Sequence, residues 1–200
     1  MTTLYLIRHG QYDSPQPVVP YRLPGYHLSQ EGVQQARAIA ERLAHEPIHA
    51  VFASKLERTM ETAVIIAAPH HLIPVADDRL LEVDSPAQGK TKEFIDSLGG
   101  WFIYDTRWYK ERNGETLDEI FSRIYGFVEE KRKEYMNRSV IAVTHGDLVM
   151  LLAMYYMGIP RTAESLRNVP YVSMASGFRI DLYAKDRVHV APIGETERNT

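Results

Sequence analysis

Two apolar runs in this chain end in the same pair of residues, a histidine followed by a glycine. Residues 4–7 lead into Arg8-His9-Gly10, and residues 140–143 lead into Thr144-His145-Gly146. Short apolar runs without alternation are typical of strands buried on both faces of a parallel sheet. Open α/β sheets bind ligands outside the carboxyl ends of such strands. We therefore expect the two histidines to form two halves of one site.

Strand-like and helix-like stretches alternate along the rest of the chain. Ser29 is a natural N-cap for one helix, and Thr116 with Glu119 forms a capping box for another. This alternation predicts an α/β fold, a three-layer α/β/α sandwich with a mostly parallel central sheet, in one domain over residues 1–200. We expect strands at residues 3–8, 49–53 and 139–143 and helices at residues 29–44, 55–68, 116–135 and 147–157. Short extended pieces are expected at residues 72–75 and 79–81. Residues 169–173 and 178–183 are expected to form a closing hairpin, which residues 188–191 continue.

Residues 83–113 break this regularity. The segment is irregular and rich in aromatic side chains, and it is too long for a plain connection between two elements. Loops of this length in compact domains are usually functional, often as lids. We therefore expect a small lid insertion at about residues 83–113.

Charge and composition exclude several classes of protein. The formal net charge is −3, with acids and bases mixed along the chain, which argues against a nucleic-acid groove and a polybasic membrane patch. The chain has no cysteine, which excludes disulfides and thiolate zinc sites. Arg8 interrupts the N-terminal apolar run, which excludes a signal peptide, and the apolar stretch 148–159 is shorter than the roughly 20 residues that span a bilayer. A cytoplasmic protein without nucleic-acid or membrane partners is the expectation, and its oligomeric state does not follow from the sequence.

His9 has the chemistry of a nucleophile. An imidazole attacks well when one nitrogen is unprotonated and the other is held by an acceptor. The guanidinium of Arg8 is a planar, charged fork suited to phosphate oxygens, and Gly10 lets a substrate approach the backbone closely. The structural alternative is a hydrogen-bonded histidine at a strand end, with Arg8 merely solvated.

Two further residues can bind an anion. His145 precedes Gly146 and Asp147 at the start of a helix, where free N–H groups favour negative charge, and a histidine that faces bound phosphate tends to be protonated. Arg58 lies in the first turn of its helix, where a cation opposes the macrodipole, so a bound anion explains it better than helix stability does. The alternatives are a core histidine for His145 and, for Arg58, an exposed ion pair with Glu57 or Glu61.

Glu82 is the candidate general acid, because it stands at the mouth of the expected lid, where a partly desolvated carboxyl can donate a proton. Asp77, Asp78 and Asp84 compete for the role, and solvation is the simpler explanation for any one of these acids. Glu115 is better explained as a dipole partner at a helix start. The pair His70-His71 beside Pro69 indicates a surface turn, because no third ligand has metal spacing there, and no metal site is expected.

Together, in this order, these residues resemble the histidine phosphatase superfamily, in its phosphoglycerate-mutase-like branch. The matching blocks are residues 6–10, 28–32 with 35–36, 54–63, 81–82, 113–116 and 143–146.

The resemblance implies a phosphomonoester hydrolase that acts on a small phosphorylated substrate and needs neither metal nor cofactor. It implies that His9 is the nucleophile and forms a phosphohistidine, and that Glu82 is the general acid and base. It also implies that Arg8, Arg58 and His145 hold the phosphoryl oxygens. In this arrangement the positive charge of these groups depresses the pKa of His9 and stabilises charge on the transferring group.

The sequence departs from the family pattern in three places. Pro15, which cannot donate a hydrogen bond, stands where relatives often carry an asparagine. Phosphate binding is therefore expected either to use one hydrogen bond fewer or to use Gln11 or Tyr12 instead, with Gln11 and Gly146 as secondary site residues. Residues 83–90 lack the Trp-Glu-Gly or Arg-His-Tyr-Gly segment that often follows the residue corresponding to Glu82 in relatives. Residues 101–109 match nothing in the family. Recognition of the leaving group is expected in these divergent segments.

Three other functions compete with a phosphatase. A phosphoglycerate mutase requires a longer cap and additional basic contacts, which a chain of 200 residues is not expected to supply. It would also need 2,3-bisphosphoglycerate for priming. A non-catalytic binding protein would use the aromatic stretch 101–109 as an exposed interface. A metallohydrolase would use His9, His145 and a carboxylate, but arginines beside a metal ion are electrostatically unfavourable.

Overall fold

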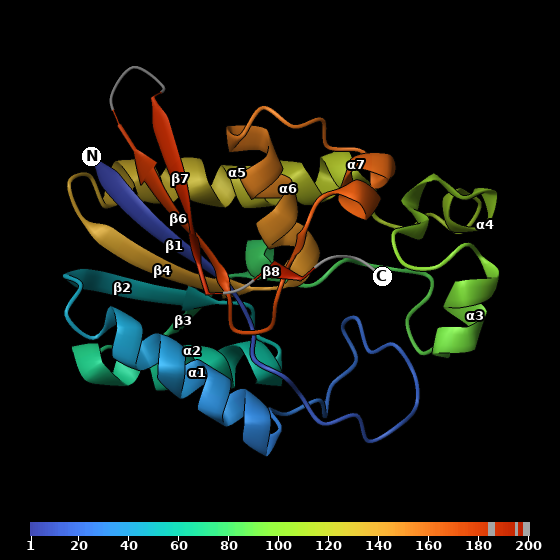
Figure 1. The fold of residues 1–200 in the computed structure, drawn as a ribbon, viewed down its shortest axis with the longest axis horizontal. Helices are drawn as coiled ribbons and strands as arrows, with labels where there is room; N and C mark the ends of the chain where they lie inside the picture. Colours follow the sequence, from blue (N-terminus) through green and yellow to red (C-terminus); the bar gives the residue numbers. More distant parts are fainter. Residues whose placement is uncertain (184–186, 195, 198–200) are drawn as a thin grey trace.

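The computed structural model describes residues 1–183, 187–194 and 196–197 (Figure 1). The strands are β1 (Thr2–Arg8), β2 (Ile48–Ala53), β3 (Val75–Ala76), β4 (Ser139–Thr144), β5 (Tyr171–Val172), β6 (Gly177–Leu182), β7 (Val188–Ile193) and β8 (Thr196–Glu197). The α-helices are α1 (Gln30–Leu43), α2 (Glu57–Ala67), α3 (Lys92–Ser97), α4 (Arg107–Lys110), α5 (Leu117–Glu134), α6 (Gly146–Tyr156) and α7 (Ala163–Asn168). Three short 3₁₀ helices are η1 (Ala68–His70), η2 (Asp78–Leu80) and η3 (Ile103–Asp105).

Six strands form the central sheet in the order β3-β2-β4-β1-β6-β7. The pairs β3–β2, β2–β4 and β4–β1 are parallel, whereas β6 is antiparallel to both of its neighbours. The sheet is therefore mostly parallel, as the sequence predicted. Its central strands β1 and β4 carry the two His-Gly pairs at their carboxyl ends.

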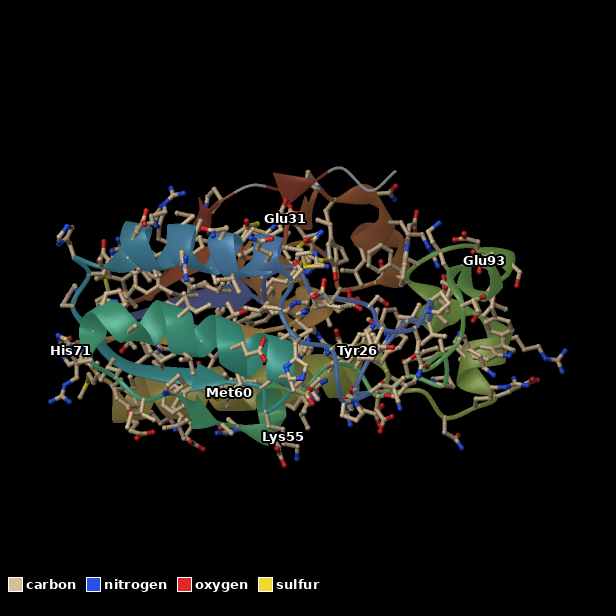
Figure 2. The ribbon with its side chains drawn as sticks, turned by 90° about the horizontal axis from the view of Figure 1, so that it is seen from below. Tyr26, Glu31, Lys55, Met60, His71 and Glu93 are labelled. Carbon is tan, nitrogen blue, oxygen red and sulfur yellow. The ribbon has the colours of Figure 1, made fainter. Side chains whose placement is uncertain are left out.

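Helices cover both faces of the sheet, α1 and α2 on one face and α5 and α6 on the other (Figures 1 and 2). Alternate residues of β1 belong to the two cores: Leu4 and Leu6 pack with α5 and α6, and Tyr5 and Ile7 pack with α1 and α2. Because each strand side chain points opposite to the next, a strand with both faces covered must be apolar throughout. The three-layer α/β/α sandwich is confirmed.

The two predicted caps are present. The Ser29 side chain accepts the N–H of Gly32 at the start of α1, and Thr116 and Glu119 form the reciprocal capping box of α5. These bonds satisfy N–H groups that have no partner within the helix.

Two short predicted pieces are wrong in detail. In the first, the strand begins only at Val75, because Pro74 has no N–H to donate, so residues 72–74 lie outside it. In the second, Arg79 and Leu80 are not extended, because the Asp77 side chain accepts the N–H of Arg79 at 3.0 Å and caps the 3₁₀ helix η2, whereas Leu81 lies beyond the end of that helix.

The predicted hairpin of 169–173 with 178–183 is also wrong. β6 pairs with β1 and β7, whereas β5 pairs with β8. A Cβ at Gly177 would lie 1.9 Å from the carbonyl oxygen of Leu6, so a glycine is required where β6 meets β1. The predicted continuation at 188–191 is correct, since it lies in β7, the hairpin partner of β6.

The segment 83–113 is less irregular than predicted, because it contains α3, η3 and α4. It lies beyond one end of the sheet and has a small core of its own, in which Ile95, Ile103 and Tyr109 are buried (Figure 1). Thr91 and Thr106 cap its two α-helices with their side chains. Within the described residues, no helix has the length and apolar character needed to cross a membrane.

Candidate active site

The register of β1 and β4 brings the two histidines together. The strands are parallel with Arg8 opposite Thr144, and the next N–H along, that of His9, donates to the carbonyl of Thr144 at 3.0 Å. Both histidines therefore leave the sheet at the same level, and their ring centroids are 5.2 Å apart. This is the arrangement that the two strand ends predicted.

The hydrogen bonds of His9 define its tautomer. Its Nδ1 lies 2.7 Å from the carbonyl oxygen of Gly10, and a carbonyl can only accept, so Nδ1 carries the proton. The other nitrogen, Nε2, then has a free lone pair, toward which the Nε of Arg58 donates at 3.2 Å. Burial, reinforced by Arg58 and His145, lowers the pKa of His9 well below its usual 6.5. His9 is thus a neutral imidazole with a lone pair on Nε2.

Gly10 lies where the chain passes close to α1. A Cβ there would be 2.7 Å from the carbonyl oxygen of Gly32, closer than real side chains approach. The N–H of Gly10 donates to the hydroxyl of Thr62 on α2 at 3.1 Å. These contacts tie the end of β1 to both helices beneath the site.

Arg58 is almost completely buried, with 1% of its surface exposed. Its Nη2 donates to the carbonyl of Tyr21 at 2.7 Å and lies 3.3 Å from Nδ1 of His145. Its Nη1 is buried and has no hydrogen-bond partner among the described residues. The exposed ion pair with Glu57 or Glu61 is therefore wrong, and a buried guanidinium with an unsatisfied donor has the chemistry to bind an anion.

Arg8 has the same unsatisfied character. Its Nη1 donates to the carbonyl of Val172 at 2.7 Å, and its guanidinium lies over the ring of Tyr171 at 5.3 Å. Its Nε is buried, and no residue within the described ranges forms a hydrogen bond with it. Two arginines on neighbouring elements thus each keep a donor available.

His145 is fully buried between polar groups. Its Nε2 lies 3.1 Å from the hydroxyl of Ser54, and its Nδ1 lies 3.3 Å from Oε2 of Glu82. Burial and the charge of Arg58 lower its pKa well below 6.5, so without an anion it is neutral. Protonation of His145, which the sequence predicts for a phosphate-bound site, therefore depends on the anion itself. The contact to Ser54 was missed, although Ser54 directly follows a strand that ends at the same edge.

Glu82 is the acid that reaches this group. Its Oε1 accepts the N–H of Val83 at 2.9 Å, and its Oε2 lies 3.9 Å from Nη2 of Arg58 in addition to its contact with His145. The three acids that competed for this role in the sequence bind cations elsewhere: Asp77 binds Arg79, Asp78 binds Lys55, and the exposed Asp84 binds Arg22.

Arg8, His9, Arg58 and Glu82 line a cavity of about 720 Å³, whereas the fully buried His145 is not among its lining residues. Its lining comes from the end of β1, the start of α2, the segment 83–113, the loop before α1 and the start of α6. The lining residues that matter here are Arg8, His9, Arg58 and Glu82, together with Tyr21 and the more exposed Trp101 and Arg167. A volume in this range holds an organic molecule much larger than phosphate alone.

The sequence model of the Histidine phosphatase superfamily (branch 1) matches residues 4–187. This chain belongs to that superfamily. The match includes residues 4–8 of β1, all of β4 and every residue of the buried polar group described above.

Named relatives include both phosphatases and mutases. The chain is 32% identical to phosphoserine phosphatase 1 of Hydrogenobacter thermophilus over 164 residues, which cover 78% of this chain and 75% of the relative. It is also 32% identical to a probable phosphoglycerate mutase GpmB of Enterobacter sp., with 84% and 82% covered. Bacillus stearothermophilus YhfR has the same fold, with a TM-score of 0.82, 26% identity and 96% of each chain covered.

The secondary site residues of this histidine phosphatase superfamily member differ in whether they line the cavity. The side chain of Gln11 accepts a hydrogen bond from Ser29 at 2.7 Å and is not among the cavity lining, whereas Tyr12 lines the cavity beneath the guanidinium of Arg58. Gly146 lines the cavity too, and a Cβ there would lie 2.3 Å from the hydroxyl of Tyr171. The bare backbone of Gly146 thus lets Tyr171 pack against the start of α6.

Asp147 is a site residue that the sequence analysis did not single out. Its carboxylate accepts hydrogen bonds from the hydroxyls of Tyr104 and Tyr171, the latter at 2.5 Å, and it lines the cavity. Burial, and the nearby Glu82, raise its pKa. Its position after the strand-ending His145-Gly146 pair was the available signal.

The aromatic stretch 101–109 divides into two parts. Trp101, Phe102 and Tyr104 line the cavity, whereas Trp108 packs against Phe94, outside the lining. Only the first part can contact a ligand in the cavity. Among the described residues, no group of three or more His, Asp or Glu side chains is arranged to hold a metal ion, and His70 and His71 form no such group.

Proposed function

We propose that this protein is a phosphomonoester hydrolase that works through a phosphohistidine at His9. The observation that carries the proposal is the tautomer of His9: its Nδ1–H is held by the carbonyl of Gly10, and its Nε2 lone pair points into a cluster of cations. An imidazole held in this way needs no base to attack a phosphorus atom.

In the first step, Nε2 of His9 attacks the phosphorus and forms a P–N bond as the ester P–O bond breaks. Glu82, in its acid form, gives its proton to the departing alkoxide, which leaves as an alcohol. Its carboxyl lies beside His145 and Arg58, on the cavity side of the cluster. The orientation agrees with a proton donor at the leaving-group oxygen.

In the second step, water replaces the histidine. Glu82, now a carboxylate, takes a proton from water as the water oxygen attacks phosphorus and the P–N bond breaks. Inorganic phosphate leaves, and both His9 and Glu82 return to their starting forms.

Arg8, Arg58 and His145 are proposed to bind the three phosphoryl oxygens. The buried, unsatisfied Nε of Arg8 and Nη1 of Arg58 support this, because an anion would satisfy both donors. Preorganised donors of this kind typically contribute a hundred- to a thousand-fold each to the rate, in rough terms.

The segment 83–113 is proposed to act as the substrate lid, since Trp101, Phe102 and Tyr104 form part of the cavity wall. A physiological substrate with a leaving group large enough to reach these side chains suits the cavity. Phosphoglycerate mutase is the second candidate, favoured by the relatives named as mutases.

The charges near the cavity mouth favour hydrolysis over mutase chemistry. A mutase must also hold the carboxylate of its three-carbon substrate. Lys92 and Arg167 line the cavity, but each forms an ion pair with an acid, Lys92 with Asp96 at 3.1 Å and Arg167 with Asp105 at 2.7 Å.

Two assays run side by side distinguish the candidates. The protein is incubated with p-nitrophenyl phosphate and, separately, with 3-phosphoglycerate primed by 2,3-bisphosphoglycerate. Phosphate release from the first, lost in His9→Ala and kept in the exposed-histidine control His45→Ala, supports the phosphatase. Interconversion of phosphoglycerates without phosphate release would establish the mutase instead. Activity that survives in His9→Ala and disappears with EDTA would establish a metallohydrolase.

A further inference from the structure

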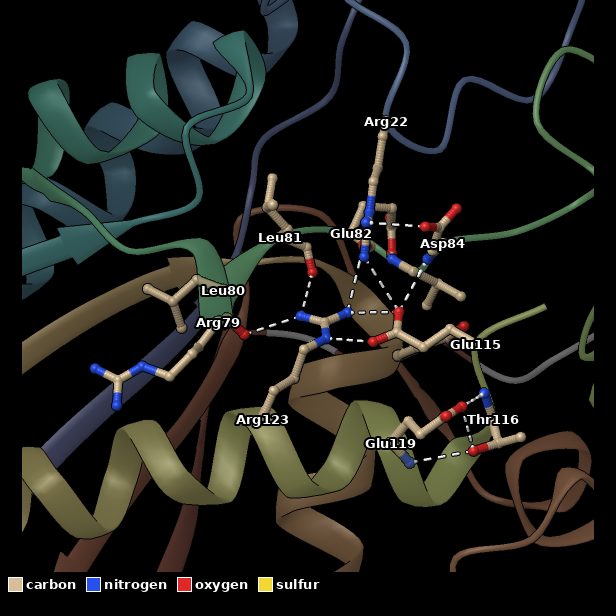
Figure 3. A network of polar contacts seen from close by, with 12 residues as sticks. Arg22, Arg79, Leu80, Leu81, Glu82, Asp84, Glu115, Thr116, Glu119 and Arg123 are labelled. Atoms are coloured by element: carbon tan, nitrogen blue, oxygen red, sulfur yellow. Dashed lines mark hydrogen bonds and ion pairs between the residues drawn. The ribbon is translucent and has the colours of Figure 1, made fainter. Parts of the chain in front are cut away.

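The backbone that carries Glu82 is held almost entirely by side chains. Residues 81–83 belong to no helix or strand, so their carbonyls lack regular backbone partners. Arg123 on α5 donates from Nη1 to the carbonyls of Arg79 and Leu81, at 2.8 and 2.6 Å, and from Nη2 to that of Glu82 at 3.3 Å (Figure 3). The hydroxyl of Thr144 donates to the carbonyl of Leu80 at 2.7 Å. Four consecutive carbonyls thus accept side-chain donors.

Glu115 completes this arrangement. Its carboxylate forms two hydrogen bonds with Arg123, at 2.6 and 3.0 Å, and also accepts the N–H of Asp84 at 2.9 Å. The N–H of Glu115 in turn donates to the carbonyl of Asp84 at 2.9 Å. The two charged side chains are only 16% and 13% exposed, so water screens their attraction weakly. The interpretation of Glu115 as a simple dipole partner is therefore incomplete.

Arg22 connects the same segment to the loop before α1. Its Nε donates to the carbonyl of Glu82 at 2.6 Å, and its Nη2 lies 3.3 Å from Glu115 (Figure 3). The preceding residue, Tyr21, accepts the hydrogen bond from Arg58. One loop thus contacts both the acid-bearing segment and an arginine of the anion site.

We propose that Arg123 and Glu115 are positioning residues for Glu82, assisted by Arg22, and that they act on proton transfer to the leaving group and not on phosphate binding. The inference rests on the proposed function. None of the three lines the cavity, so none touches a ligand there, and each acts on Glu82 through the backbone that it holds. The charges of Arg123 and Arg22 also lower the pKa of His145, and the inhibition by inorganic phosphate in the test below separates that effect from positioning of Glu82. Displacement of a reacting group by about 1 Å can cost roughly a hundred-fold in rate, which sets the scale of the effect.

The test uses Arg123→Lys and Glu115→Gln in the full chain. For each variant, kcat/KM is measured with p-nitrophenyl phosphate, whose leaving group needs no proton, and with an alkyl phosphate, whose leaving group does. We expect the alkyl value to fall at least ten-fold and the aryl value less than three-fold, in rough terms, with unchanged inhibition by inorganic phosphate. Adding Arg123→Lys to Glu82→Gln should cause no further loss on the alkyl substrate, because the proton donor is already absent.

Arg132→Lys is the matched control, because Arg132 lies on the same helix and donates to the carbonyl of Tyr183 at 2.9 Å, away from the cavity. It should leave the alkyl-to-aryl ratio unchanged, and a melting curve for each variant shows whether the fold is intact. Equal losses on both substrates, or an additive loss in the Glu82→Gln background, would overturn the positioning role. If His9→Ala keeps full activity, the proposed function itself is wrong, which is a separate outcome.

Discussion

The Nε of Arg58 donates to Nε2 of His9 across 3.2 Å, and neither side chain exposes more than 3% of its surface. A cation that is buried beside a neutral imidazole contributes little to folding, because it has lost its water and, among the described residues, gained no carboxylate closer than 3.9 Å. Burial accordingly lowers the pKa of Arg58. We interpret this pair as machinery for binding an anion, maintained at a cost in stability.

Arg58→Met tests that interpretation. The apolar side chain removes a buried charge, so the free energy of unfolding in urea should be no lower than that of the natural protein. The same variant should lose roughly a hundred- to a thousand-fold in kcat/KM, because one phosphate donor is gone. Arg42→Met, at an exposed position of α1, is the control for both measurements. A variant that is clearly less stable, or nearly as active as the natural protein, contradicts the assignment.

The pH dependence of stability has a definite sign. Burial, with Arg58 adding to it, lowers the pKa of His9 and of His145 well below 6.5 in the folded protein. Below about pH 6.5 the unfolded chain takes up protons that the folded protein refuses, so the stabilisation is complete above that pH and is lost as the pH falls toward the folded pKa values. The limiting slope is about 1.4 kcal/mol per pH unit for each histidine.

Urea unfolding at a series of pH values measures this slope. The double variant His9→Gln/His145→Gln should show a much weaker decline between about pH 6.5 and 5. His27→Gln is the control of opposite sign, because its exposed imidazole pairs with Glu61, which raises its pKa. In His27→Gln the loss of unfolding free energy with falling pH should persist or become steeper. A double variant with the natural slope would show that the two buried histidines are not the groups responsible.

Glu82→Gln tests the proton donor. The amide cannot donate a proton to an alkoxide, so kcat/KM should fall by about a hundred-fold or more for alkyl phosphates and much less for p-nitrophenyl phosphate. Asp78→Asn, at an acid whose side chain is 71% exposed and pairs with Lys55, should leave the ratio of the two substrates unchanged. Equal losses on aryl and alkyl esters in Glu82→Gln would rule out the general-acid role.

Gly10→Ala tests how tightly the site is packed. The added Cβ would approach the carbonyl oxygen of Gly32 to 2.7 Å, so backbone must move and the protein should lose about 1–3 kcal/mol of stability. Gly126→Ala is the matched control, because Gly126 is exposed within α5 with open space around it, and alanine there should stabilise by about 0.5–1 kcal/mol. Thermal unfolding of both variants checks the pair, and a stability gain in Gly10→Ala would contradict the packing argument.

The sequence was sufficient for the parts of the site that depend on strand ends. Residues 4–7 and 140–143 are apolar because both faces of their strands are covered, and that pattern alone put His9 and His145 at one edge of a sheet. Arg58 could be placed near them by its helix, but its burial could not be predicted from spacing. From the sequence, an exposed ion pair of Arg58 with Glu57 or Glu61 was an equally valid interpretation, and only the fold excludes it.

The contacts that hold Glu82 could not be predicted, because they join residues far apart in the chain. Arg22, Glu115 and Arg123 come from a loop, a helix start and a helix face, and no local periodicity relates them.

The predicted hairpin of 169–173 with 178–183 is wrong for a similar reason. β6 is apolar enough to pair with β5 or with β1, and its pairing with β1 depends on the close approach of the two strands at Gly177. Local patterns predict elements, whereas long-range polar contacts require the assembled fold.

Covalent capture of the intermediate tests the central claim most directly. The protein is mixed with a ³²P-labelled phosphomonoester, quenched in alkali within milliseconds and digested, and the labelled peptide is sequenced. The account predicts an alkali-stable, acid-labile label on His9 in the natural protein, which His45→Ala retains and His9→Ala lacks. Rapid turnover with no label on His9, or a label on any other residue, would contradict it.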